Sequence, residues 1–295
     1  MTDWPLLPFA DWEDTCDTLH LWTQIVGKTR LALTPLENHW WNVPLYVTPR
    51  GLGTSPIPFR EESFEAEFDF IEHKLLLRTS GGDQASIGMY PRSVADFYQE
   101  YMARLRSLGI EVSLYAKPVE FDDPTPFDQD HHHASYDQAS VEKFRRVLIG
   151  VDRVFKEFRS RFIGKCSPVH FFWGSFDLAV TRFSGRRAVL AADADPITRE
   201  AYSHEVISCG FWPGDRRFKY AAFYSYTAPA PPGLKDEEVR PSGAGYWEPQ
   251  LGEFILKYDD ARAAESPERA ILDFCQSTYE AGAKLAGWDR DALER

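Results

Sequence analysis

The feature that most constrains the fold is the order helix, strands, helix, which the sequence predicts twice along the chain of 295 residues. A similar short sequence motif occurs in each half of the chain. His39-Trp40-Trp41 leads into residues 45–50, and His170-Phe171-Phe172 leads into residues 178–182. Each copy follows a helical pattern and a proline, and each continues into sequence typical of strands. We therefore expect an α+β fold of two related lobes, each an antiparallel sheet packed by long helices. The similarity between the two motifs indicates an internal duplication, but convergent strand sequences would give the same pattern.

Apolar residues at helical spacing predict two helices in the first half of the chain. One spans residues 11–33, with Asp11 as its N-cap, and ends before Pro35. The other follows Ser93, whose side chain is expected to cap the helix, and ends at Gly109. Both helices are long enough to cover a sheet.

The second half begins with a helix over residues 138–163 that carries an unbroken apolar stripe and ends at Gly164. The stripe comprises Val141, Phe144, Leu148, Val151, Phe155, Phe158 and Phe162. Such a stripe packs across a sheet or against a partner helix. A final helix is expected from Ser266-Pro267 to about Gly287.

Strands are expected between the helices of each half. Residues 64–71 give the cleanest period-2 pattern, in which Phe and Ala alternate with Glu and Asp, as in a sheet with one face in water. The other expected strands are 43–49, 75–79, 111–116, 169–183, 203–211, 219–226 and 253–258. This organisation predicts a first lobe over residues 1–120, an acidic, proline-rich connector over 121–137 and a second lobe over 138–295.

Charge and composition exclude several classes of function. The formal net charge of −12 argues against binding to nucleic acids or to anionic membranes. No apolar run approaches the ~18 residues of a membrane span, and the N-terminus lacks the features of a signal peptide. Four scattered cysteines show no metal-ligand or disulfide spacing. We therefore expect a cytoplasmic protein with reduced thiols.

No standard catalytic or cofactor motif is present, so no cofactor is predicted. His131, His132 and His133 are the obvious candidates for a metal site. Neighbouring side chains in extended backbone point to opposite sides, however, so a solvated loop is the preferred interpretation.

Candidate binding and catalytic residues come from histidines and charges that lie among aromatic residues. A cleft that combined them would suit a small planar or anionic ligand. The candidate ligand-binding residues are His39, Trp41, Arg50, Trp173, Arg182 and Trp212. The candidate acid–base pairs are His170 with Asp177 and His204 with Glu205. His20, Gln24 and Lys28 share one edge of the first helix, which is either an exposed polar face or part of the pocket lining.

Five segments resemble a family of uncharacterised bacterial proteins known only as a domain of unknown function. They are HLWTQIVGK (residues 20–28), NHWWNVPLYVT (38–48), GKCSPVHFFWGSFDLAVTR (164–182), YSHE (202–205) and GFWPG (210–214). The resemblance implies no particular activity.

Three functional hypotheses follow from the sequence. The first is a small-molecule-binding protein with an aromatic cleft. The second is an enzyme, a hydrolase or lyase that uses one of the two histidine–carboxylate pairs. The third is an interaction protein that dimerises through the striped helix 138–163. The sequence leaves open whether the chain is a monomer or a homodimer.

Overall fold

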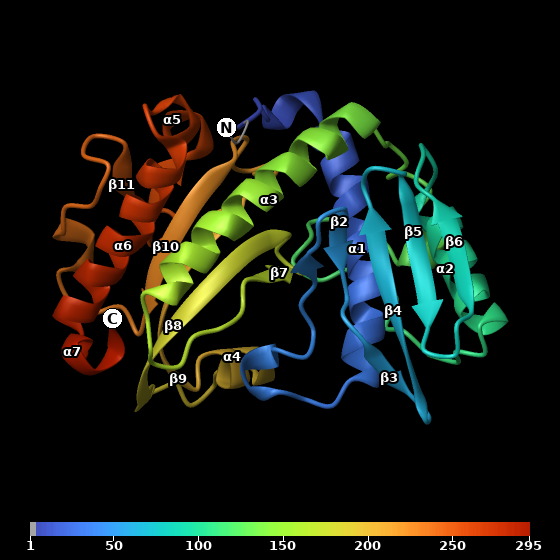
Figure 1. Cartoon of the computed structure of the whole chain (residues 1–295), viewed down its shortest axis with the longest axis horizontal. Helices are drawn as coiled ribbons and strands as arrows, with labels where there is room; N and C mark the ends of the chain where they lie inside the picture. The colour runs from blue at the N-terminus through green and yellow to red at the C-terminus, as the bar shows by residue number, and fades with distance from the viewer. Residues whose placement is uncertain (1–3) are drawn as a thin grey trace.

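The computed structural model describes residues 4–295 and has an α+β architecture. Two antiparallel sheets of six strands each lie side by side, and long helices pack against them (Figure 1). We refer to the sheet formed by β1–β6 as the N-terminal sheet and to the sheet formed by β7–β12 as the C-terminal sheet. The expected fold class is confirmed.

The N-terminal sheet is a meander in the order β1-β2-β4-β5-β6, and β3 pairs with β4. Helices α1 (Glu13–Leu33) and α2 (Val94–Ser107) pack beside it, and the rings of Trp22 and Phe97 stack between them at 4.5 Å. The strands are β1 (Tyr46–Val47), β2 (Gly51–Gly53), β3 (Ile57–Phe59), β4 (Glu62–Asp69), β5 (Lys74–Thr79) and β6 (Gln84–Gly88).

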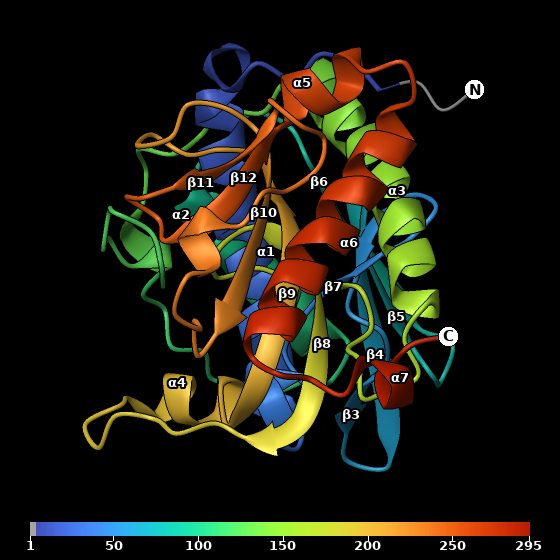
Figure 2. The same ribbon diagram turned by 90° about the vertical axis from the view of Figure 1, so that its left-hand side faces the viewer.

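The C-terminal sheet has the order β11-β12-β10-β9-β8-β7. Helices α3 (Gln138–Ser160) and α6 (Pro267–Leu285) cover one of its faces, and Figure 2 shows α4 on the other side of the strands. The strands are β7 (His170–Phe172), β8 (Asp177–Arg187), β9 (His204–Trp212), β10 (Ala222–Ala228), β11 (Gly245–Glu248) and β12 (Glu253–Lys257). The shorter helices are α4 (Pro196–Ala201), α5 (Tyr258–Ala263), α7 (Arg290–Leu293), η1 (Phe9–Asp11), η2 (Asn38–Trp40), η3 (Phe127–Gln129) and η4 (Leu234–Asp236).

One backbone pair joins the two sheets. The N–H groups of Leu45 and Phe171 each donate to the carbonyl of the other residue, both at 2.8 Å. Leu45 directly precedes β1 and Phe171 is the middle residue of β7, so the first strand of one sheet lies beside the first strand of the other. The duplication itself remains a hypothesis.

The apolar stripe of α3 belongs to the core of this same chain. All seven of its side chains are buried, and Phe144, Val151 and Phe158 are 0% exposed. The stripe packs against the C-terminal sheet and α6, which is the arrangement that covers it without a second protein. This face of α3 is therefore not available to a partner helix, contrary to the third hypothesis.

The helix ends show which capping predictions were right. The hydroxyl of Ser93 accepts the N–H of Asp96 at 3.1 Å, and the final helix begins after Ser266 as expected. The prediction for Asp11 was wrong, because this residue lies in η1 and α1 begins after Trp12 without a side-chain cap.

The strand expected at residues 111–116 does not form. The N–H of Phe127 binds the carbonyl of Ala116 at 2.8 Å, and the Gln24 side chain of α1 binds Val119. These partners hold the end of the segment and the residues after it against α1 and η3, and residues 111–116 pair with no strand among residues 4–295. The expected strand at 169–183 is in fact two strands, β7 and β8, joined by a turn.

Candidate functional site

Helices α3 and α6 cover one face of the C-terminal sheet but not the other. Successive residues of β8 point to opposite faces. Arg182 points toward α3 and α6, where its guanidinium lies 3.6 Å from the ring centre of Phe158. Asp177, Ala179 and Thr181 point the other way. We call that second side of the sheet the open face.

Polar side chains gather on the open face in what we call the carboxyl–tyrosine cluster. It comprises Glu120, Asp177, Tyr202, Tyr224, Tyr226 and Glu253. Its centre is the nearly buried carboxyl of Asp177 (5% exposed), which accepts hydrogen bonds from the hydroxyls of Ser175 and Tyr224. Burial raises the pKa of Asp177 despite these two bonds.

A glycine makes room for the contact between Asp177 and Tyr224. Gly210 of β9 lies between Ala179 of β8 and Tyr224 of β10 in the sheet register. A Cβ at this position would lie 2.1 Å from Cζ of Tyr224, so no other residue fits without displacing the ring. The tyrosine ring lies across this strand to reach Asp177.

The remaining tyrosines extend the cluster along β10. The ring of Tyr226 stacks on that of Tyr224 at 6.1 Å, and the hydroxyl of Tyr202 donates to that of Tyr226 at 3.2 Å. All three side chains are partly exposed. Tyrosines in this condition present an apolar ring and a polar tip to a ligand.

Two further carboxyls lie close enough to Asp177 to feel its charge. Burial and then the Asp177 carboxylate raise the pKa of Glu253 to about 7, and the same two causes raise the pKa of Glu120. Among residues 4–295, no Lys or Arg forms an ion pair with Glu120, Asp177 or Glu253. The cluster thus holds three carboxyls without a protein cation.

The polar row on α1 comprises His20, Gln24 and Lys28, and its first two members position Glu120. The amide of Gln24 donates to the carbonyl of Val119 at 2.8 Å and accepts its N–H at 2.9 Å. His20 Nε2 lies 2.9 Å from the carbonyl of Gly174, and the Glu120 carboxylate packs against the same glycine. The interpretation of this row as an exposed face was wrong, since all three of its side chains are at least nine-tenths buried.

A second group on the open face comprises His39, Trp41, Lys165, Phe183 and His204, and we call it the histidine–tryptophan cluster. His39 Nδ1 donates to the carbonyl of Ala201 at 3.1 Å, so its Nε2 accepts from the Lys165 ammonium at 2.7 Å. Lys165 also lies 5.1 Å from the ring centre of Trp41. Burial and then Lys165 lower the pKa of His39, which keeps this imidazole neutral.

His170 lies beside this cluster and has no hydrogen-bond partner at either ring nitrogen within residues 4–295. It is 0% exposed, and its ring centre lies 5.9 Å from that of Trp41 and 5.5 Å from that of Tyr46. Burial lowers the pKa of His170 to about 3, so it is neutral. Unsatisfied buried polar atoms are uncommon in native proteins and call for an explanation.

The structure brings some of the sequence candidates together and separates others. His39, Trp41, His170 and His204 are neighbours: the ring centres of His39 and His204 are 5.7 Å apart. Trp173 lies in the turn before Asp177, and its indole donates to Val43 at 2.8 Å.

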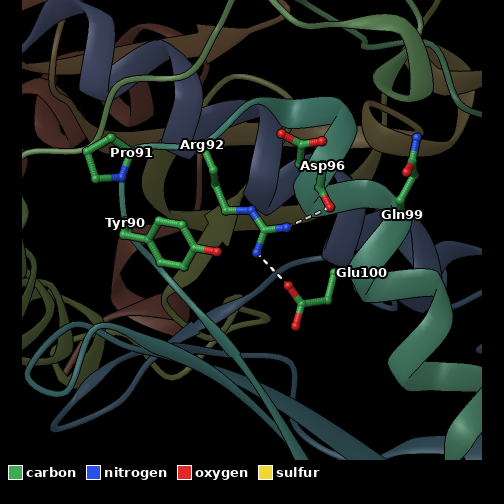
Figure 3. A pocket seen from close by; sticks show the side chains of 6 residues that line it. All are labelled: Tyr90, Pro91, Arg92, Asp96, Gln99 and Glu100. Atoms are coloured by element: carbon green, nitrogen blue, oxygen red, sulfur yellow. Dashed lines mark hydrogen bonds and ion pairs between the residues drawn. The ribbon is translucent and has the colours of Figure 1, made fainter.

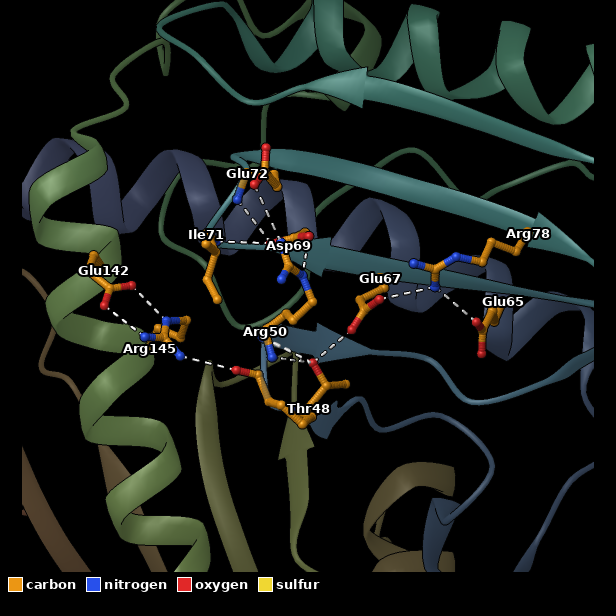
Figure 4. Close-up of polar contacts among 12 residues, drawn as sticks. Thr48, Arg50, Glu65, Glu67, Asp69, Ile71, Glu72, Arg78, Glu142 and Arg145 are labelled. Atoms are coloured by element: carbon orange, nitrogen blue, oxygen red, sulfur yellow. Dashed lines mark hydrogen bonds and ion pairs between the residues drawn. The ribbon is translucent and has the colours of Figure 1, made fainter. Parts of the chain in front are cut away.

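Three candidates lie apart from this group. Arg182 is on the helix-covered face. Arg50 is in the N-terminal half and pairs with Asp69 at 2.5 Å (Figure 4). Trp212, at the end of β9, packs on Phe218 at 5.8 Å.

Neither expected acid–base pair is formed. His204 and Glu205 are adjacent on β9 and point to opposite faces; Glu205 binds Arg186 at 2.7 Å, away from the histidine. His170 has no hydrogen bond to Asp177, which instead binds Ser175 and Tyr224.

The three successive histidines do not converge. His133 Nδ1 donates to Asp130 at 2.8 Å, whereas His131 and His132 are exposed. In the part of the chain that the structure describes, no group of three or more His, Cys, Asp or Glu side chains has the arrangement of a metal site.

Two cavities lie away from both clusters. One of about 610 Å³ is at the start of α2, where Arg92 binds Glu100 at 2.6 Å (Figure 3). The other, of about 710 Å³, lies between β11 and α6, and Lys284 and Arg240 on its wall pair with Glu237 and Glu280. The charged groups named here are already paired.

A family model described as a family of unknown function (DUF5996) matches residues 4–295. The chain belongs to this family. No curated protein and no solved structure matches the chain. The resemblance noted in the sequence is thereby confirmed, and the DUF5996 match supplies no activity. Among the described residues, no helix is both long and apolar enough to cross a membrane.

Sequence reasoning did not single out most of the carboxyl–tyrosine cluster in this DUF5996 chain. The positions of Tyr224 and Tyr226 could have been recognised, because two tyrosines that are two residues apart in an expected strand must lie on the same face of the sheet. Glu120 could not, since it lies in a loop placed by Gln24 from α1. Glu253 stood at the start of an expected strand and had no recognisable partner.

Proposed function

We propose that the chain binds a small organic ligand on the open face of the C-terminal sheet, over the carboxyl–tyrosine cluster. This face carries partly exposed aromatic side chains from separate elements, including Trp41, Phe172, Tyr202 and Tyr226. Aromatic side chains with a few polar groups between them are the usual lining of small-molecule sites.

The observation that carries the proposal is the set of three carboxyls without a protein cation. Like charges near Asp177 oppose one another, which contributes to the raised pKa values of Glu120 and Glu253. A ligand with a positively charged amino group would relieve this repulsion, and the tyrosine rings would stabilise the same charge. We therefore assign the ligand to the class of small organic amines.

The histidine–tryptophan cluster suits the other end of such a ligand. Within residues 4–295, Lys165 has no carboxylate partner within 4 Å, and it lies beside the half-buried ring of Trp41. His170 is on the same face of the sheet, but its ring is fully buried. A planar or anionic group on the ligand would therefore contact the Trp41 ring and the Lys165 ammonium.

An enzymatic function is the second candidate, and one observation favours it. A carboxyl with a pKa of about 7, as at Glu253, can donate or accept a proton near neutral pH. Asp177 provides a second carboxyl beside it. The geometry gives less support to a hydrolase or lyase that depends on a histidine–carboxylate pair, because neither pair is hydrogen-bonded.

Thermal unfolding tests the binding proposal. A panel of amines (putrescine, spermidine, choline and arginine) would be compared with succinate and with uncharged amides. We expect at least one amine to raise Tm, and Glu253→Gln to abolish the shift. Glu61→Gln is the matched control, because Glu61 is exposed in the N-terminal half and forms no ion pair with any residue of 4–295. The proposal fails if no amine shifts Tm, or if both variants retain the shift equally.

A further inference from the structure

Lys28 is a buried amine that the proposed binding function does not use. It is 4% exposed, and within residues 4–295 it has neither a hydrogen bond nor a carboxylate within 4 Å. A buried lysine normally pairs with a carboxylate or a carbonyl, because an ammonium removed from water without acceptors is costly. Removal from water without an acceptor therefore disfavours the charged form of this amine, and contacts with aromatic rings offset only part of that cost.

Three aromatic rings surround the amine in place of an acceptor. Its Nζ lies 5.1 Å from the ring centre of Tyr115 and 5.8 Å from those of Phe127 and Trp173. Phe127 is held in position by its N–H bond to Ala116, and Trp173 by its indole bond to Val43. Two of the three walls are thus fixed by hydrogen bonds.

The third wall lies on the solvent side of the amine. Tyr115 is 67% exposed and lies in the irregular segment where a strand was expected. Its ring is the only one of the three walls that faces water, since Phe127 and Trp173 are buried. The Tyr115 side is therefore the side of the amine that is nearest to water.

We propose that Lys28 is a nucleophilic amine and a covalent modification site for small apolar aldehydes. The neutral amine nitrogen attacks the carbonyl carbon to give a carbinolamine, and loss of one water leaves a neutral imine. The C=O double bond is replaced by C=N, and no oxidant or reductant takes part. An uncharged product suits three aromatic walls that offer no counter-ion.

Desolvation supports this assignment, because burial lowers the pKa of Lys28 to about 8. An ordinary lysine titrates near 10.4, so at pH 7 the neutral fraction of Lys28 would be on the order of a hundred times larger. Enclosure by the rings slows access and offsets part of this gain.

Reductive trapping on the wild-type protein provides the test. The full chain would be treated at pH 7 with a limiting amount of benzaldehyde and sodium cyanoborohydride, and the benzylated peptides would be quantified by mass spectrometry. We expect Lys28 to be labelled at least about five times faster than the exposed Lys235. Equal or slower labelling of Lys28 would overturn the proposal.

Two variants sharpen the result. Tyr115→Ala removes the exposed wall and should accelerate labelling of Lys28 without changing that of Lys235, which separates access from intrinsic reactivity. Lys28→Met keeps the site apolar and should remove only the labelled peptide that contains residue 28. If labelling of Lys28 in Tyr115→Ala does not exceed that of Lys235, the amine is not nucleophilic and the assignment is wrong.

Discussion

The two sheets of this protein use acidic side chains in opposite ways. In the N-terminal sheet, Glu65, Glu67 and Asp69 alternate along β4, and each has an arginine. Arg78 binds Glu65 at 3.1 Å and Glu67 at 3.0 Å, and Arg50 binds Asp69 at 2.5 Å (Figure 4). These carboxylates are neutralised by the sheet itself.

On the open face of the C-terminal sheet, Asp177 and Glu253 have no such partner among residues 4–295. Asp177 and Glu253 lie among tyrosines, and their pKa values are raised, mainly by burial. For Asp69, burial also acts to raise the pKa, but the bonds from Arg50 and two backbone N–H groups outweigh it and leave the pKa lowered. The difference teaches that acidic residues at alternate positions of a strand do not by themselves identify a binding site. Acidic residues that lack arginine or lysine partners are the better indicator.

The largest expected effect comes from blocking the contact between the tyrosine and Asp177. Gly210→Val should lower the free energy of unfolding by about 3 kcal/mol, because its Cβ would displace the Tyr224 ring. Urea unfolding measures this loss. Gly88→Ala is the control in the other sheet, where the nearest atom to a Cβ belongs to the exposed ring of Tyr90, at 3.0 Å. Equal losses in the two variants would mean that Gly210 has no special role.

Removing the charge of one carboxyl in each sheet tests the comparison directly. Asp69→Asn should cost about 2 kcal/mol, since it weakens a charged hydrogen bond at a carboxyl that is 2% exposed. Asp177→Asn should be neutral or stabilising at pH 8, because it removes a buried charge without a cation. Urea midpoints at pH 8 provide the measurement, and a greater loss for Asp177→Asn would reverse the argument.

The pH dependence of stability should differ between the sheets by about 1–2 kcal/mol. The folded-state pKa of Glu253, about 7, lies above the ~4.3 of an unfolded carboxyl, so the folded protein holds this proton more tightly. That contribution is complete below pH ~4.3 and is lost as the pH rises through 7. Asp69, whose pKa is lowered, contributes above its unfolded pKa of about 3.9 and loses the contribution at lower pH.

Unfolding of the wild type and of Glu253→Gln between pH 4 and 8 separates these effects. The wild type should lose stability relative to the variant between about pH 4.3 and pH 7. Parallel pH profiles for the two proteins would show that Glu253 is not protonated at neutral pH in the folded state.

Much of the fold could be predicted because periodicity is a local property. The pattern of residues 64–71 predicted β4 and its acidic face, and the stripe from Val141 to Phe162 predicted α3 and its buried side. Ser93 gave the start of α2. Each of these signals depends on a few neighbouring residues and on whether one face is buried.

The site could be predicted only in part, because it depends on contacts between distant segments. His39 and His204 do meet, but they are far apart in sequence, and His39 is held by Glu200 and Ala201 of α4, a helix that the sequence did not predict. Arg182 looked like a ligand-binding residue because it was charged in an apolar strand. One position along β8 determines which face it points to, and that face is the core.

The backbone pair between Leu45 and Phe171 has a consequence for any attempt to divide the molecule. β1 and β7 are the end strands of their sheets, and the hydrogen bonds between Leu45 and Phe171 join these two edges. Cutting the chain between residues 121 and 137 and separating the pieces would leave each with a newly unprotected edge strand. Unpaired edges recruit other strands, so isolated halves should tend to aggregate or reassociate with each other.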